Sequence, residues 1–322
     1  MNSRNVCETN NPSDWREKLF ADLLQSVHLR SSVYFRPELG APWGFKLADH
    51  GTTFHIVAHG KCWVEVTGTT PPTELVAGDF VVIPRGDAHI MCDSTASTIV
   101  DVFELARRGA PDRKGVFRAG GNGVITKLVC GGMQFDNGAT DPLLAVLPPL
   151  IHVKGKDGKG ATWLQATVSQ VLEELDSSGA GAQAVVTRLA DILFIKAVRS
   201  YFEQNIDTVQ YGWLAAIRDR HVGPVLAQLH ARAQEAWTVA SLARQVALSR
   251  SLFAEKFAEL VGEPPLRYLK RLRLNAAAIR LRATNDKLST IAADAGYESA
   301  AAFTKAFKRT LGKTPGEYRR SR

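Results

Sequence analysis

The last third of the chain contains one pattern twice, as WTVASLARQVALSRSLFAEKFAELVGEPPLRYL (residues 237–269) and as STIAADAGYESAAAFTKAFKRTLGKTPGEYR (residues 289–319). A shift of 50 residues places six residues of the first copy on identical residues of the second. Such constrained residue types recurring at one offset indicate a supersecondary unit that is used twice. The matched pairs are Ser249 and Ser299, Phe253 and Phe303, Phe257 and Phe307, Gly262 and Gly312, Pro265 and Pro315, and Tyr268 and Tyr318.

Each copy has the spacing of two helices joined by a tight turn. Thr238 and Ser249 are placed to cap the two helices of the first copy, and Ser289 and Ser299 those of the second. The phenylalanines of each second helix recur four residues apart and therefore share one buried face. This spacing predicts two helix-turn-helix units joined by a stiff helix over 266–282. A pair of helical hairpins in a generic bundle is the alternative interpretation.

Positive charge is concentrated in the same part of the chain. Residues 213–322 hold 20 Lys and Arg against 9 Asp and Glu, whereas the first 212 residues hold 20 against 23. This asymmetry favours a polyanion such as nucleic acid as the partner of the basic part, although a solvated basic surface would give the same count. The polar stretch 206–212 is the predicted linker between a first domain over 1–205 and a DNA-binding domain over 213–322.

The residues of 220–320 closely resemble the DNA-binding domain of the AraC-type (AraC/XylS) bacterial transcription regulators. The resemblance rests on the motifs LSRSxF, GxPPLxYL, IAxxxGYxS, FxKAFKR and GxxPxxYR. It implies double-stranded DNA, at an operator or promoter, as the partner of this domain. It also implies base contacts from Ser251, Ala254 and Glu255.

The recognition helix of each unit is expected to face DNA with the side opposite its buried phenylalanines. Glu255 could accept a hydrogen bond from cytosine N4, or it could only pair with Arg250 or Lys256. The basic side chains are expected to contact phosphates, which position the protein, so the first helix should carry more of the base readout. The predicted DNA-binding residues are Arg250, Ser251, Ala254, Glu255 and Lys256 in the first unit, and Ser299, Ala301, Ala302, Thr304, Lys305, Lys308 and Arg309 in the second, with Ala300 beside them.

The residues before the linker have a different texture. Short β-branched runs such as FHIVA (54–58) and CWVEV (62–66) alternate with Gly and Pro, which predicts an antiparallel barrel or sandwich. The run GDFVVIPRGDAH (78–89) fits G-x5-P-x-G-x2-H, and residues 15–205 resemble the cupin-like sensor domains that precede AraC-type DNA-binding domains. The predicted fold class is therefore α+β, with a cupin-like antiparallel β-barrel over about 15–135, helices over about 161–203, and then an all-α domain with two helix-turn-helix units.

A small-molecule effector is predicted to bind inside the barrel, because a small barrel can enclose one ligand. Metal-binding cupins combine two histidines and a carboxylate of a first signature with the histidine that matches His89. The spacing places no histidine at the first-signature positions, so we expect no metal and no cofactor. Whether His50, His55 or His59 binds a metal stays open. The candidate ligand-binding residues are Trp43, His55, Trp63 and His89.

Three functions of different classes compete. The leading prediction is a sequence-specific DNA-binding regulator that responds to a small molecule or another signal through the cupin-like domain. The alternatives are a cupin metalloenzyme with a DNA-binding anchor, and a redox-responsive regulator with a thiol switch at Cys62, Cys92 or Cys130. We expect no enzymatic activity, since neither a full metal triad nor an acid–base pair is evident. The effector, the target genes and the choice between activation and repression stay open.

Location and assembly can also be predicted. No apolar run approaches the roughly 18 residues that a membrane span needs, and the N-terminus lacks the apolar region of a signal peptide. Together with four scattered cysteines, these features predict a cytoplasmic protein without a membrane partner. The apolar stripes of 161–175 and 184–202 exceed what one barrel needs for cover, so we expect a homodimer formed through these helices.

Overall fold

The computed structural model describes residues 29–48, 51–69, 71–107, 111–112, 115–135, 147–155, 161–177, 179–205 and 212–320, together with Leu19, Ala21, Leu24 and Leu144. The chain divides into two compact units. One spans His28–Gln204, and the other holds the chain from Asn205 onward.

The first unit is built on two β-sheets. Within the described ranges, one sheet has the strand order β11-β6-β3-β10-β1-β9 and the other the order β5-β4-β7-β2-β8. Neighbouring strands are antiparallel except for the parallel pairs β1–β9 and β2–β8. The predicted β-rich, cupin-like first domain is thereby confirmed. The strands are β1 (Leu29–Gly40), β2 (Gly44–Leu47), β3 (Thr52–His59), β4 (Lys61–Val66), β5 (Thr73–Val76), β6 (Phe80–Ile83), β7 (His89–Cys92), β8 (Val100–Asp101), β9 (Val116–Gly120), β10 (Ile125–Phe135) and β11 (Ile151–Val153).

The core of this unit lies between the two sheets. Alternation along β4 buries Cys62 and Val64 while their neighbours on the strand are more exposed. Phe45 of β2 and Val81 of β6 belong to the same buried cluster, as does Leu128 of β10. The alternation of each strand thus divides its side chains between this core and the outer face of its sheet.

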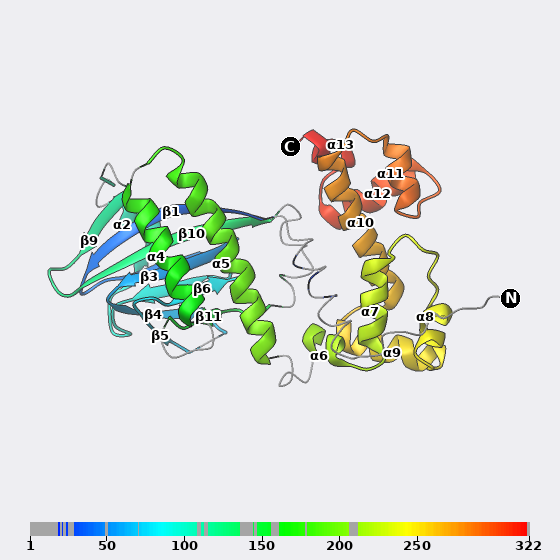
Figure 1. The fold of residues 1–322 in the computed structure, drawn as a ribbon, viewed down its shortest axis with the longest axis horizontal. Helices are drawn as coiled ribbons and strands as arrows, with labels where there is room; N and C mark the ends of the chain where they lie inside the picture. Colours follow the sequence, from blue (N-terminus) through cyan, green and yellow to red (C-terminus); the bar gives the residue numbers. More distant parts are fainter. Residues whose placement is uncertain are drawn as a thin grey trace. The chain divides into compact units, whose positions relative to one another are not determined.

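Helices α4 (Ala161–Ser177) and α5 (Ala182–Asn205) cover one face of the six-stranded sheet (Figure 1). Phe194 of α5 meets Phe135 of β10 with ring centroids 5.4 Å apart. Asp191 of α5 accepts a hydrogen bond from the backbone N–H of Ser31 in β1 at 3.0 Å. The helices predicted after the barrel are therefore part of the first unit. A shorter helix, α2 (Val102–Arg107), follows β8.

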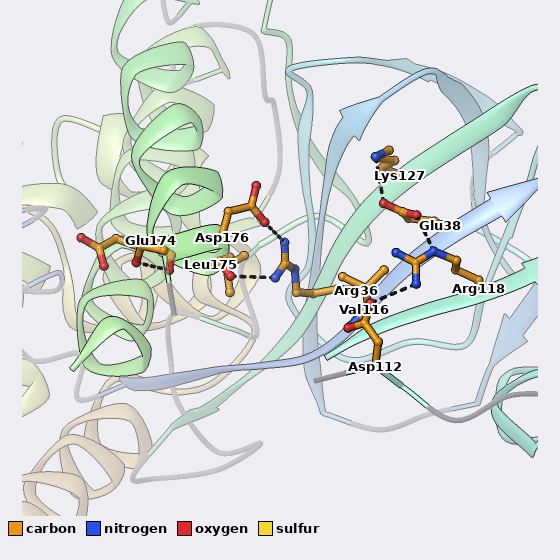
Figure 2. Close-up of polar contacts among 10 residues, drawn as sticks. Arg36, Glu38, Asp112, Val116, Arg118, Lys127, Glu174, Leu175 and Asp176 are labelled. Carbon is orange, nitrogen blue, oxygen red and sulfur yellow. Dashed lines mark hydrogen bonds and ion pairs between the residues drawn. The ribbon is translucent and has the colours of Figure 1, made fainter. Parts of the chain in front are cut away.

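Arg36 of β1 fixes the C-terminal end of α4 (Figure 2). Its guanidinium donates to the carbonyl oxygen of Leu175 at 2.9 Å and to the carboxylate of Asp176 at 2.7 Å. Carbonyls in the last turn of a helix lack intrahelical partners, so this cation satisfies a group that the helix itself leaves open. Figure 2 also shows the neighbouring chain of ion pairs, in which Glu38 accepts from both Lys127 and Arg118.

The second unit is entirely helical in its described residues, which confirms the predicted all-α domain. Its connector α10 runs from the first helix pair to the second (Figure 1). The pair α8–α9 forms the first predicted unit and the pair α11–α12 the second. The helices are α6 (Gly212–Arg218), α7 (Val222–Ala231), α8 (Val239–Gln245), α9 (Arg250–Val261), α10 (Pro265–Ala283), α11 (Leu288–Asp294), α12 (Ala300–Leu311) and α13 (Pro315–Arg320).

The helix caps follow the sequence with one exception. Thr238 caps α8 with a full capping box, and Ser249 caps α9. The prediction that Ser289 caps α11 is wrong, because α11 begins at Leu288 and Ser289 lies within its first turn. The turn between α11 and α12 is one residue longer than the turn between α8 and α9. The first helices of the two pairs, α8 and α11, are therefore offset by 49 residues, whereas α9 and α12 are offset by 50.

Candidate functional site

Helix α9 presents a polar face that the helical core leaves open. Phe253 and Phe257 are fully buried and hold the opposite face of α9 on the core. Arg250, Ser251 and Glu255 are exposed, and the predicted contact residue Ala254 is partly exposed. The exposed part of this face therefore includes residues that the sequence predicts to contact DNA, near the N-terminal end of the helix.

Lys256 is held by an ion pair with the start of α7. Its Nζ lies 2.8 Å from Oδ2 of Asp219, whose other carboxylate oxygen accepts from the backbone N–H groups of His221 and Val222. Burial alone would raise the pKa of the Asp219 carboxyl, but these hydrogen bonds outweigh it and hold the pKa below its ordinary value. Of the two cations considered for Glu255, Lys256 is therefore engaged elsewhere, and no ion pair of Glu255 occurs in the described part of the chain.

Helix α12 repeats this arrangement with a different set of side chains. The hydroxyl of Ser299 accepts from the backbone N–H of Ala302 at 3.2 Å and so caps the helix. The hydroxyl of Thr304 donates to the carbonyl of Ala300 at 2.7 Å, which leaves it as an acceptor toward a ligand. Phe303 and Phe307 are buried. The exposed members of the predicted set are Ser299, Ala301, Ala302, Lys305, Lys308 and Arg309.

Connector α10 contributes to the cores of both units. Near its start, the Tyr268 ring meets the ring of Phe257 in α9 with centroids 5.8 Å apart. Farther along, Leu274 and Leu281 join the buried cluster that contains Phe303 of α12. One continuous helix therefore sets the separation of the two recognition helices.

His230 of α7 contacts α10 near the N-terminal end of that helix. Its Nε2 lies 2.6 Å from the hydroxyl of Tyr268 in α10. Burial, reinforced by the nearby charge of Arg271, lowers the pKa of His230 to about 4. The imidazole is therefore neutral at physiological pH.

The β-rich compact unit, His28–Gln204, contains a large cavity. Its volume is about 950 Å³, and its wall includes residues from both sheets and from α2. Three buried polar side chains reach it from β3, at Thr52, Thr53 and His55. The rest of the wall is mainly apolar. It comprises Tyr34, Phe35, Phe45, Leu47, Gly51, Pro84, Arg85, Val102, Phe103, Ala106, Cys130, Gly131, Met133, Gln134, Phe135 and Leu144.

His55 and His89 form a buried pair behind this wall. Their Nε2 atoms lie 2.9 Å apart, and Nδ1 of His89 lies 3.1 Å from the carbonyl oxygen of Asp87. Burial lowers the pKa of both imidazoles, that of His55 most strongly and with a further contribution from the nearby His89. Both rings are therefore neutral at physiological pH.

The residues around this pair do not fit a cupin metal centre. A metal ion needs three or four converging ligands, whereas the described residues contain no group of three His, Cys, Asp or Glu able to hold one. His59 lies exposed at the end of β3, and His50 lies outside the described residues. The short His55–His89 contact is a hydrogen bond between the two rings.

Of the four predicted ligand-binding residues, only His55 lines the cavity. Trp43 is buried in the core with its ring stacked on Phe45, at 6.0 Å between centroids. Trp63 is half-buried on β4, and His89 lies behind His55. Sequence reasoning missed Thr53 and the apolar wall. The alternation of β3 gave a signal for Thr53, since it lies two residues before His55 and shares its face.

The three described cysteines are buried. Burial raises the pKa of the thiols of Cys62, Cys92 and Cys130 above the ordinary value. Because the thiolate is the reactive form, these surroundings disfavour oxidation of the three thiols.

The family comparisons agree with this division of the chain. A family described as Cupin matches residues 18–203, and one described as Helix-turn-helix domain matches residues 242–321. A putative AraC-like transcription regulator of Streptomyces lividans is 34% identical over 300 residues, which cover 93% of this chain and 97% of that protein. The HTH-type transcriptional regulator AlkR of Acinetobacter baylyi is 31% identical over 312 residues, covering 95% and 99%.

Among solved structures, the DNA-binding domain of AdpA in complex with a target DNA is 29% identical. It covers 32% of this chain and 92% of that domain, with a TM-score of 0.30. Among the described residues, no helix is both long enough and apolar enough to cross a membrane. The near-full-length identity to named regulators, with both family matches, places the chain in the AraC-like transcription regulators, as a cupin domain followed by a DNA-binding helix-turn-helix domain.

Proposed function

We propose that this regulator reads DNA with α9 and α12 together and is controlled by a small molecule bound in the cavity of its cupin domain. The observation that carries the proposal is that both recognition helices expose a polar face while one helix, α10, is buried in the core of both units. Such a pair suits successive major grooves on one side of a duplex, about 34 Å apart. Regulators of chromosomal DNA act in the cytoplasm of bacteria, which is where we place this protein.

The two helices would divide the work. Ser251 and Glu255 of α9 supply hydrogen-bonding groups for base edges, whereas Ala301 and Ala302 of α12 offer only methyl contacts. Lys308, in the last turn of α12, would bind phosphate and position the helix. The first helix-turn-helix unit, α8–α9, would therefore specify sequence, and the second, α11–α12, would mainly add affinity.

A binding experiment separates these roles. Duplexes selected from a random library supply a preferred site, and single-base variants of it are titrated at two salt concentrations. Glu255→Ala should relax discrimination at one base pair, by roughly 1–3 kcal/mol. Lys308→Ala should weaken binding to all variants alike and reduce the salt slope by about 1. Glu259→Ala, which removes another exposed carboxylate one turn along α9, is the matched control and should leave base preference unchanged. An equal effect of Glu255→Ala on every variant would contradict the assigned role.

The covering helices support the proposal of a homodimer. Val185 and Ile192 of α5 are each 43% exposed, and Leu189 lies between them at helical spacing. An exposed apolar stripe on a helix that is fixed to the sheet is suited to pair with a second copy. Dimerisation would raise the affinity for paired sites through effective concentration. Sedimentation of the full chain and of Ile192→Glu tests this, and a monomeric wild-type protein at micromolar concentration would refute it.

A further inference from the structure

We infer that the effector is a neutral, largely apolar molecule with a hydroxyl group, which donates a hydrogen bond to Nδ1 of His55 and accepts one from the hydroxyl of Thr53. This inference rests on the proposed control by a small molecule and names its chemical class.

Nδ1 of His55 and Oγ1 of Thr53 are both fully buried, and neither has a hydrogen-bond partner in the described part of the chain. Their residues are 3% and 5% exposed, and both line the cavity. Buried polar groups in proteins are nearly always hydrogen-bonded, so two orphaned atoms on side chains that line one cavity indicate a missing partner. Thr53 and His55 are two residues apart on β3 and therefore share one face of the strand, so one ligand can contact both.

The hydrogen-bond chain fixes what His55 offers to a ligand. The carbonyl of Asp87 can only accept, so Nδ1 of His89 carries the hydrogen of that bond. In a neutral imidazole the other nitrogen is then an acceptor, so Nε2 of His89 accepts from Nε2–H of His55. His55 therefore presents a bare lone pair at Nδ1. A ligand that binds here must therefore donate a hydrogen bond to Nδ1 of His55.

The remaining wall excludes other ligand classes. A carboxylate would place its charge against the lone pair of His55 in an apolar space, which is unfavourable. Arg85, the cation in the described wall, is already paired with Asp87 at 3.2 Å. An ether or a hydrocarbon would fill the apolar space but leave Nδ1 of His55 without a donor. The exposed rings of Tyr34 and Phe103 belong to the same wall and extend its apolar character to the surface.

Three matched probes test the inference on the full chain by isothermal titration calorimetry. They are 4-octylphenol, 4-octylanisole, in which the hydroxyl is methylated, and 4-octylbenzoate, in which it is replaced by a carboxylate. The phenol should bind at least about tenfold more tightly than the anisole, as expected for a buried acceptor that gains or loses its donor. The benzoate should bind more weakly than the phenol.

Two variants assign the effect to the named atoms. Thr53→Val keeps the shape of the side chain and removes its hydroxyl, and His55→Leu removes the acceptor. His55→Leu should reduce the phenol-to-anisole ratio toward one, whereas Thr53→Val should weaken the binding of both probes alike, because the oxygen of either probe can accept from the Thr53 hydroxyl. If His55→Leu fails to fold, the weaker binding of both probes to Thr53→Val still tests the Thr53 contact.

Equal binding of phenol and anisole, tighter binding of the benzoate, an unchanged ratio in His55→Leu, unchanged binding of both probes to Thr53→Val, or no binding of any probe would overturn the inference. Binding of the selected duplex by the same preparations is measured in parallel. It separates a wrong ligand class from a failure of the proposed DNA-binding function.

Discussion

A fall in pH should lower the stability of the DNA-binding unit through one residue, His230. This imidazole is wedged between α7 and α10, with Nε2 2.6 Å from the Tyr268 hydroxyl, and burial first and the Arg271 charge second lower its pKa to about 4. We predict that the wild-type unit loses stability between pH 7.5 and pH 5, and that His230→Gln, which retains a donor and an acceptor but does not titrate there, removes most of that loss.

The magnitude follows from proton linkage. An unfolded histidine has a pKa near 6.5, so between that value and about 4 the unfolded chain binds a proton that folded His230 does not. Stability is therefore complete above pH 6.5 and falls as the pH drops toward the folded pKa. At pH 5 the loss from this residue amounts to about 2 kcal/mol.

Hydrogen exchange followed by mass spectrometry is the suitable assay, because peptides from α7 and α10 report on this unit alone. Exchange at pH 5 and pH 7.5, corrected for intrinsic rates, gives the opening free energy of wild type and variant. His221→Gln, at the start of α7, is the matched control, since it leaves the His230–Tyr268 contact in place. The same pH dependence of the opening free energy in His230→Gln as in wild type would refute the role assigned to His230.

Two further perturbations test how the helical units are held. Ala247 and Gly296 occupy the equivalent turn position of the two units with φ of 54° and 81°. Ala247→Gly should stabilise the domain by about 0.5–1 kcal/mol and Gly296→Ala should destabilise it by about 1–2 kcal/mol in thermal unfolding, because only glycine adopts this conformation freely. The added Cβ at Gly296 would also lie 2.6 Å from Nη1 of Arg273, which adds to the destabilisation. A change in stability of the same sign in both variants would contradict the equivalence of the two turn positions. Asp219→Ala should cost about 1–2 kcal/mol, because it removes the acceptor of the backbone N–H groups of His221 and Val222 at the start of α7 together with the Lys256 pair. A loss confined to DNA affinity would instead make Asp219 a binding residue.

Local sequence rules were sufficient for most of the helical domain. Side-chain caps such as Ser249 and Ser299, and buried phenylalanines such as Phe253 and Phe303, depend on residues within one turn of each other. The repeat therefore predicted the recognition helices and their exposed faces. It failed at Ser289, because the second turn holds one more residue than the first and shifts the start of α11.

The sensor cavity was harder to predict because its wall comes from distant strands. Trp43 and Trp63 suggested ligand contacts by residue type alone, but Trp43 packs in the core against Phe45 and Trp63 lies on β4 outside the cavity wall. His55 was found, yet its partner His89 is 34 residues away, and only the sheet pairing brings the two rings together. Residue type can nominate a site of this kind, while strand register decides its members.

The salt dependence of DNA binding should be smaller than the charge count of the domain suggests. Several cations of α10 are committed to internal contacts: Arg271 pairs with Glu263, Arg280 pairs with Asp286, and Arg273 donates to the carbonyls of Ala233 and Glu235. On the recognition helices, the exposed cations are Arg250, Lys305, Lys308 and Arg309. If these contact phosphates, about four counterions are released per domain, and the slope of log K against log salt should lie near −4. A slope near −10, as the net +11 of residues 213–322 would suggest, would show that cations outside the two recognition helices also contact the DNA backbone.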